Sequence, residues 1–174
     1  GMGEPAHNLD NVLEAIERLP IKPDSILLRD YSDINVRDGS ALIREKQLTD
    51  IARFERADAF DAESLAQVRP HPTLAIVSGL YELFPDNAPV SRSLSGLSRC
   101  VEPGGYLVYT GQPWHPQLEL IARTLTSHRG NAPWVMRRRT QAEMAQLVAA
   151  AGFRKLDQLI DQWGIFSVSL AIRS

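Results

Sequence analysis

Intervals of three and four between apolar residues predict an amphipathic helix at the start of the chain, on one stripe made of Leu9, Val12, Leu13, Ile16 and Leu19. Asn8 is its expected cap and Pro20 its stop. Residues 26–30 (ILLRD) then form a short apolar run that predicts a buried strand ending in an acid. A helix over about 33–46 follows, with Ser32 as its expected N-cap.

Two further apolar runs, 50–60 (DIARFERADAF) and 73–84 (TLAIVSGLYELF), predict a second and a third strand. The almost unbroken LAIV of the later run is typical of a parallel strand that is covered on both faces. A helix is expected to begin near Pro89 and to end at VEPGG, before a fourth strand at 106–110. These segments alternate as βα units do.

The C-terminal third predicts two helices and a hairpin. Helices are expected over about 117–128 and 141–151, the second with Thr140 and Glu143 as a capping box and Gly152 as its stop. Only DQWG separates FRKLDQLI (153–160) from IFSVSLAI, which is too short for a crossover, so these strands should pair antiparallel. The whole pattern predicts one α/β domain over residues 1–174, with a mostly parallel, doubly wound sheet and one reversed edge strand.

Composition narrows the possible partners. The chain has 174 residues, with 19 Lys and Arg against 21 Asp and Glu, so no overall basic field attracts nucleic acid or an anionic membrane. No run is apolar enough for a membrane span or a signal peptide, and Cys100 is the single cysteine. We therefore expect a cytoplasmic protein. The four histidines are scattered, so we expect no metal site. Gly1 before Met2 is typical of a cloning remnant.

Five segments resemble, in order and spacing, the later motifs of class I S-adenosylmethionine-dependent methyltransferases: ILLRDYS, ADAFD, SGLYELFPD, VEPGGYLVYTG and RTQAEMAQLVAAAGF. The resemblance runs from about residue 24 to the C-terminus. It is strongest to a bacterial group whose domain is sometimes attached to an α/β-hydrolase. It implies a Rossmann-like three-layer sandwich, S-adenosylmethionine as the cofactor, and transfer of a methyl group to a small molecule by direct displacement.

The resemblance also implies six cofactor-binding residues, all at C-terminal ends of predicted strands: Asp30, Tyr31, Asp58, Ala59, Ser78 and Gly79. Asp30 would accept hydrogen bonds from the ribose, and Tyr31 would pack on the adenine. Ser78 and Gly79, followed by Leu80, would lie near the sulfonium. Open α/β sheets bind ligands at these strand ends. Asp30 could equally cap the following helix, and Tyr31 could be a rim or core aromatic.

Four residues are candidates for the substrate side: Tyr81, Glu82, Trp114 and His115. His115 could act as a general base near neutral pH, although PWHP is also a proline-fixed loop whose tryptophan could simply pack. Orientation alone can supply about 7 to 11 kcal/mol to such a transfer, so we assign no catalytic residue. The run Arg137 to Arg139 is interpreted as a solvated face, with an acidic substrate group as the alternative.

One expected feature is missing. Class I methyltransferases place a strand and a glycine-rich loop before the segment that corresponds to ILLRD, whereas residues 4–25 contain no glycine. HNLDNVLEAIERL resembles the helix that follows that loop. We expect the first strand and loop to be either cut off upstream or lost. The chain is accordingly a methyltransferase domain or, alternatively, a degenerate module without catalysis that serves in binding or dimerisation.

Three expectations follow from the missing strand. The strands at Ile26 and Leu74 should pair directly in parallel, unless a partner chain fills the gap, because open backbone groups each cost about 1 to 3 kcal/mol when buried. Exposed apolar surface should lead to a homodimer. S-adenosylmethionine should bind these 174 residues very weakly or not at all.

Overall fold

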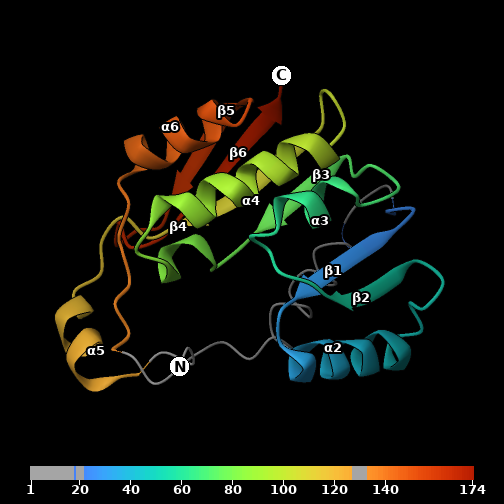
Figure 1. The fold of residues 1–174 in the computed structure, drawn as a ribbon, viewed down its shortest axis with the longest axis horizontal. Helices are drawn as coiled ribbons and strands as arrows, with labels where there is room; N and C mark the ends of the chain where they lie inside the picture. Colours follow the sequence, from blue (N-terminus) through green and yellow to red (C-terminus); the bar gives the residue numbers. More distant parts are fainter. Residues whose placement is uncertain (1–17, 19–21, 127–132) are drawn as a thin grey trace. The chain divides into compact units, whose positions relative to one another are not determined.

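The computed structural model describes residues 18, 22–126 and 133–174 (Figure 1). Contacts between residues divide the chain into two units, residues 1–59 and 60–174, and each is described by itself below. The amphipathic helix predicted from Leu9 to Leu19 lies outside the described residues.

The described part of the first unit contains a βαβ motif. Strand β1 (Ile26–Asp30) pairs in parallel with β2 (Ala52–Arg56), in a register that places Asp30 beside Arg56. Helix α2 (Asp33–Glu45) connects them, and Ser32 is its N-cap as predicted, since its hydroxyl accepts from the Asn35 N–H at 3.4 Å. Apolar side chains from all three elements form a separate core: Ile26, Leu28, Leu42, Ile43, Leu48, Ile51, Ala52 and Phe54.

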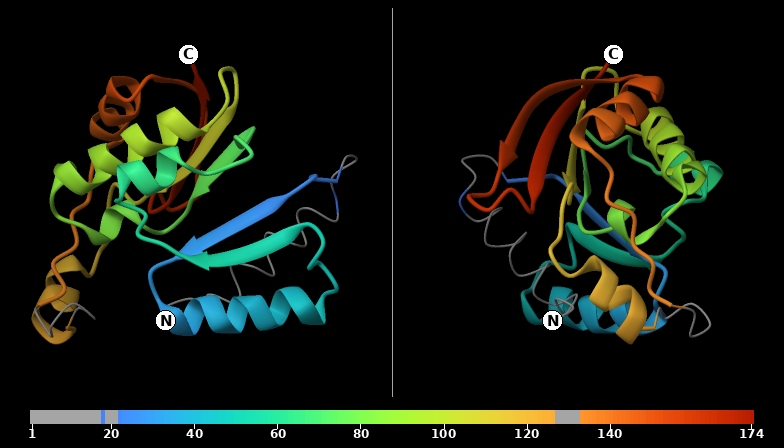
Figure 2. Two further views of the ribbon diagram at one scale, coloured as in Figure 1. Left: turned by 45° about the vertical axis from the view of Figure 1, so that its right-hand side comes forward. Right: turned by 90° about the vertical axis from the view of Figure 1, so that its left-hand side faces the viewer.

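The second unit is a four-stranded mixed sheet with helices packed on one face (Figures 1 and 2). Its strands are β3 (Leu74–Val77), β4 (Tyr106–Gly111), β5 (Phe153–Ile160) and β6 (Ser167–Arg173). Its helices are α3 (Ala62–Ala66), α4 (Asn87–Cys100), α5 (Leu118–Thr124), α6 (Gln141–Ala150) and the 3-10 helix η1 (Tyr81–Leu83). Side chains of α4 and α6 share one core with β4, β5 and β6.

The order of strands in this sheet is β3-β4-β6-β5, so the prediction of a reversed strand at the edge is wrong. The antiparallel hairpin of β5 and β6 is confirmed, but β6 lies between β4 and β5 and is antiparallel to both. Strand β6 has small or apolar side chains on both faces from Ser167 to Ile172, as an interior strand needs, whereas β5 carries Arg154, Lys155 and Asp157. Charges of this kind protect an exposed sheet edge from further pairing.

The predicted direct pairing of the strands at Ile26 and Leu74 would join the two units, and it stays a prediction. Each strand has a parallel neighbour in its own unit, β2 for β1 and β4 for β3. Ile26 and Leu28 of β1 are partly buried in the first unit's own core.

The run 73–84 is a strand only at its start. β3 stops at Val77, and Gly79 follows with φ +66°, a left-handed conformation that ends the extended chain. The rest of the run forms η1, which the apolar pattern did not reveal. Among the described residues, no helix combines the length and the apolar character that a membrane crossing requires.

Candidate functional site

Asp30 ends β1, and both of its carboxylate oxygens have local partners. Oδ1 accepts from the Ser32 N–H at 2.7 Å, and Oδ2 accepts from the Asn35 amide at 3.0 Å. Asp30 therefore stabilises the start of α2, as the capping interpretation expected. Each oxygen retains a second lone pair, so the ribose role stays a prediction.

Tyr31 follows Asp30 and projects from the first unit, with 67% of the residue exposed. The Arg56 guanidinium lies 5.4 Å from the centroid of its ring, within the range of a cation–π contact. Arg56 also donates to the Tyr31 carbonyl at 3.2 Å and pairs with Asp33 at 3.3 Å. Asp58 and Ala59 follow β2, and Asp58 is exposed.

In the second unit, Ser78 and Gly79 are exposed at the end of β3. The Gly79 N–H donates to the Thr110 hydroxyl at 2.8 Å, which joins the end of β3 to the end of its parallel neighbour β4. An added Cβ at Gly79 would meet nothing within 4 Å, so its positive φ is the reason for glycine here.

Tyr81 in η1 is a core residue. Its hydroxyl lies 2.9 Å from that of Ser93 in α4, and burial raises the pKa of the phenol well above its usual range. The predicted substrate-side role of Tyr81 would need this hydroxyl, which is already bonded inside the core.

Glu82 is buried next to Tyr81, with 7% of the residue exposed. Its Oε2 atom has no hydrogen-bond partner among the described residues. Burial raises the pKa of the Glu82 carboxyl, against the opposing effects of its own backbone N–H and of the Arg138 and Arg139 charges.

The arginine run is not a solvated face throughout, which corrects the sequence interpretation. Arg137 is exposed and pairs with Glu143 at 2.6 Å. Arg139 is buried, and its guanidinium donates to the carbonyls of three loop residues and to one side chain: Tyr81, Phe84, Asp86 and Asn87 Oδ1. Arg138 is half-buried and donates to the Gln112 side chain.

Arg138, Arg139 and Gln112 are thus residues that the sequence interpretation missed. No local pattern marks their burial, because the partners of Arg138 and Arg139 lie 26 and 58 residues away in the chain.

Trp114 and His115 follow β4. Trp114 is 55% exposed, and His115 is half-buried. The Gln117 N–H donates to His115 Nδ1 at 3.1 Å, which makes Nδ1 an acceptor and assigns the proton of a neutral ring to Nε2. The imidazole thus holds the turn before α5, and the role of His115 as a general base stays a prediction.

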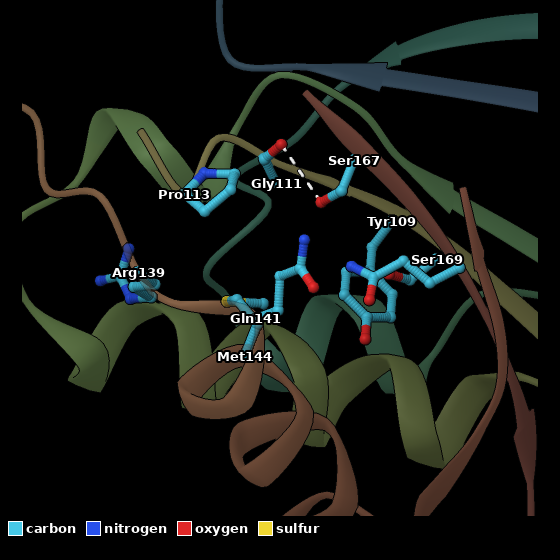
Figure 3. A pocket seen from close by; sticks show the side chains of 9 residues that line it. Tyr109, Gly111, Pro113, Arg139, Gln141, Met144, Ser167 and Ser169 are labelled. Carbon is cyan, nitrogen blue, oxygen red and sulfur yellow. Dashed lines mark hydrogen bonds between the residues drawn. The ribbon is translucent and has the colours of Figure 1, made fainter. Parts of the chain in front are cut away.

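A small pocket lies on the helix-covered face of the sheet (Figure 3). Tyr109, Ser167 and Ser169 line it from the strands, and the Gln141 side chain reaches toward its centre from α6. Burial raises the pKa of Tyr109, against a hydrogen bond with Ser169. Arg139 lines the pocket too, but its guanidinium already donates to the carbonyls of Tyr81 and Phe84.

The structure therefore brings together two groups of the predicted residues, one in each unit. Asp30, Tyr31, Asp58 and Ala59 lie at the ends of β1 and β2. Ser78, Gly79 and Glu82 lie with Thr110, Gln112 and Arg138 at the ends of β3 and β4. No cluster of three or more possible metal ligands occurs in the described part of the chain.

Comparison with known proteins gives one family and many related folds. A family described as "Putative methyltransferase" matches residues 7–173. The uncharacterized protein YnbC of Escherichia coli (strain K12) is 57% identical over 162 residues, which are 93% of this chain and 28% of that protein.

Two solved structures show the fold. The mitomycin 7-O-methyltransferase MmcR matches 99% of this chain and 47% of its own, with a TM-score of 0.73 and 16% identity. The O-methyltransferase NcsB1 from neocarzinostatin biosynthesis, in complex with S-adenosyl-L-homocysteine and 1,4-dihydroxy-2-naphthoic acid, matches 99% and 47%, with a TM-score of 0.72 and 15% identity. The chain thus has a Rossmann-like methyltransferase fold, and it spans less than half the length of these relatives.

Proposed function

We propose, from the premise that this chain belongs to the methyltransferase family, that it binds S-adenosylmethionine and transfers the methyl group to a small-molecule acceptor. The single observation that carries the proposal is the family match over nearly the whole chain, on a fold whose solved relatives include O-methyltransferases.

The residues at the end of β1 fit the adenosine half of this cofactor. Asp30 is held in place by Ser32 and Asn35 and has lone pairs left for ribose hydroxyls, and Tyr31 offers an exposed aromatic surface. When bound, the cofactor supplies a methyl group on a positively charged sulfur, which an acceptor lone pair can displace. The chain's task is to hold and orient the reactants.

The amino-acid half of the cofactor has no equivalent support, because residues 4–25 contain no glycine. Each unmade charged hydrogen bond forfeits about 1.5 to 3 kcal/mol, and two such losses weaken binding by roughly two to four powers of ten. We therefore expect residues 1–174 to bind weakly, and a version extended upstream by a strand and a glycine-rich loop to bind well.

Isothermal titration of both versions with S-adenosylmethionine tests this proposal. The expected result is tight binding by the extended version that falls at least tenfold in Asp30→Asn, while Asp33→Asn serves as the matched control on the same helix turn. Failure of the extended version to bind would support the alternative, a module that serves in binding or dimerisation without catalysis. Tight binding by the short version would assign the loop's role to another segment, with GEPAHN the first to mutate.

We also propose a homodimer. Large apolar side chains are exposed on the strands of the second unit, including Leu74, Ile76, Leu159 and Val168, and association would bury such side chains. Sedimentation at micromolar concentration tests this directly, and a stable monomer would contradict it.

A further inference from the structure

Arg56, the last residue of β2, makes three contacts with the segment that follows β1. Its guanidinium carbon lies 5.4 Å from the centroid of the Tyr31 ring, and its Nε–H donates to the Tyr31 carbonyl at 3.2 Å. The third contact is an ion pair with Asp33 at 3.3 Å. In the register of β1 and β2, Arg56 lies beside Asp30, the residue before Tyr31. One side chain therefore holds both the backbone and the ring of Tyr31.

These contacts contribute little to the stability of the first unit. The side chains of Arg56 and Asp33 are 55% and 74% exposed, and ion pairs at such a surface are weak. Tyr31 is itself mostly exposed, so the arginine orders a ring that buries little apolar surface. The arrangement is better explained by what the ring binds. Ordering the ring beforehand reduces the conformational entropy that is lost when a ligand stacks on it.

The guanidinium leaves one face of the Tyr31 ring for a ligand. Arg56 lies over one face, so the other face and the ring edge provide the exposed surface of Tyr31. A planar base can stack on that other face, since offset stacking is a preferred geometry for aromatic rings. Asp30 is the neighbouring residue in the chain, so a ribose attached to that base would lie next to its carboxylate.

The positive charge of Arg56 adds a preference among bases. A tyrosine ring by itself attracts cations through the negative charge on its faces. With a guanidinium already over one face, a cationic base on the other face meets Coulomb repulsion, whereas a neutral purine does not. We infer that Arg56 is a positioning residue of the adenosine site, which holds Tyr31 for stacking and makes the site favour an uncharged base over a cationic one.

The inference rests on the proposed function, because the ligand is the adenosine half of the cofactor. The test adds adenosine, or 1-methyladenosine, which is cationic near neutral pH, to the full chain and follows the Tyr31 ring resonances by NMR, which measures millimolar affinities. Adenosine should move these resonances. Arg56→Gln should weaken adenosine by about threefold or more. It should also shift the ratio of the two affinities toward the cationic probe by about threefold or more.

Two further variants separate charge and geometry from folding. Arg56→Lys keeps the positive charge and loses the planar guanidinium, so adenosine should weaken while the ratio of affinities stays near that of the wild-type chain. Arg37→Gln is the matched control, because it removes an exposed arginine of the same unit that is paired with Asp38. It should change neither affinity. Amide spectra of β1 and α2 should be the same in all variants apart from the residues next to each substitution.

The outcomes distinguish this inference from the proposed function. Adenosine binding that is unchanged in Arg56→Gln would overturn the role of Arg56 and leave the cofactor proposal standing. An equal loss for both probes would overturn the charge preference and with it the inference. Adenosine that leaves the Tyr31 ring resonances unmoved would overturn the inference together with the adenosine site. Titration of the extended version with S-adenosylmethionine tests the proposed function separately.

Discussion

Two carboxylates lie near the C-terminal ends of parallel strands, Asp30 as the last residue of β1 and Glu82 after β3, and they are held in different ways. Asp30 is fixed by its neighbours, because its partners Ser32 and Asn35 are two and five residues away. The segment around Glu82 is held instead by Arg139, whose guanidinium donates to the Tyr81 carbonyl. Arg139 and Tyr81 are 58 residues apart in the sequence. A carboxylate with fixed local partners is suited to hold a ligand in one position. A buried carboxylate with one oxygen that has no partner among the described residues is suited to exchange a proton.

The largest expected effect is from Arg139→Ala, which removes the distant support. Four hydrogen bonds disappear, one of them buried and three part-buried, and the carbonyls of Tyr81, Phe84 and Asp86 lose donors. We expect a loss of at least about 3 kcal/mol in the free energy of unfolding of the second unit, measured by urea titration. Arg137→Ala is the control, since its exposed pair with Glu143 is worth about 1 kcal/mol or less. Equal losses of unfolding free energy in the two variants would contradict the role of Arg139 in holding this segment.

A glycine in each unit tests whether the two cores respond separately. At Gly96 an added Cβ would lie 2.9 Å from backbone atoms of Ala62, so Gly96→Ala should cost about 1 to 3 kcal/mol. At Gly39 the Cβ would meet the Phe54 ring at 2.3 Å. That ring can rotate, and alanine favours a helix by about 1 kcal/mol, so Gly39→Ala should cost less. Amide hydrogen exchange should report each change mainly in its own unit. Uniform loss of protection would argue against separate cores.

Removing the local support has a smaller effect. Asp30→Ala eliminates the acceptor for the Ser32 N–H and the Asn35 amide, and we expect a loss of about 1 to 2 kcal/mol in the stability of the first unit. Asp33→Ala, in the exposed first turn of the same helix, should lower the stability by only a few tenths of the loss expected for Asp30→Ala. The measurement is again urea unfolding, followed by circular dichroism. If Asp33→Ala is the more destabilising variant, Asp30 does not hold the turn.

The smallest effect has the opposite sign. The folded state raises the pKa of Glu82 mainly by burial, so it holds that proton more tightly than the unfolded chain does. Stability is therefore greatest below the unfolded pKa of a glutamate and falls as pH rises through the folded pKa. Glu82→Gln should be more stable than the wild-type chain by about 1 kcal/mol near neutral pH, with a difference that shrinks toward pH 4. A difference that is constant with pH would contradict the raised pKa.

The sequence predicted the surroundings of the cofactor-side residues better than those of the substrate-side residues. Asp30 and the Ser32 cap could be predicted, because strand, acid and cap are neighbours in the chain. The burial of Tyr81 and the partners of Arg139 could not, since they depend on contacts with α4 and with a loop more than fifty residues away.

The same contrast between local and distant contacts explains which features of the strands could be predicted. Local apolar pattern and turn chemistry by themselves determined that strands lie within residues 26–30, 50–60, 73–84 and 106–111 and that 153–173 form an antiparallel hairpin, because such patterns act within a few residues. The pattern did not mark where the strands in 50–60 and 73–84 end. Only the tertiary structure decided that β6 takes the interior place beside β4 and that one oxygen of the buried Glu82 has no partner among the described residues. Strand order and the satisfaction of buried polar groups depend on which distant surfaces pack together, and a hydrophobic pattern does not specify that choice.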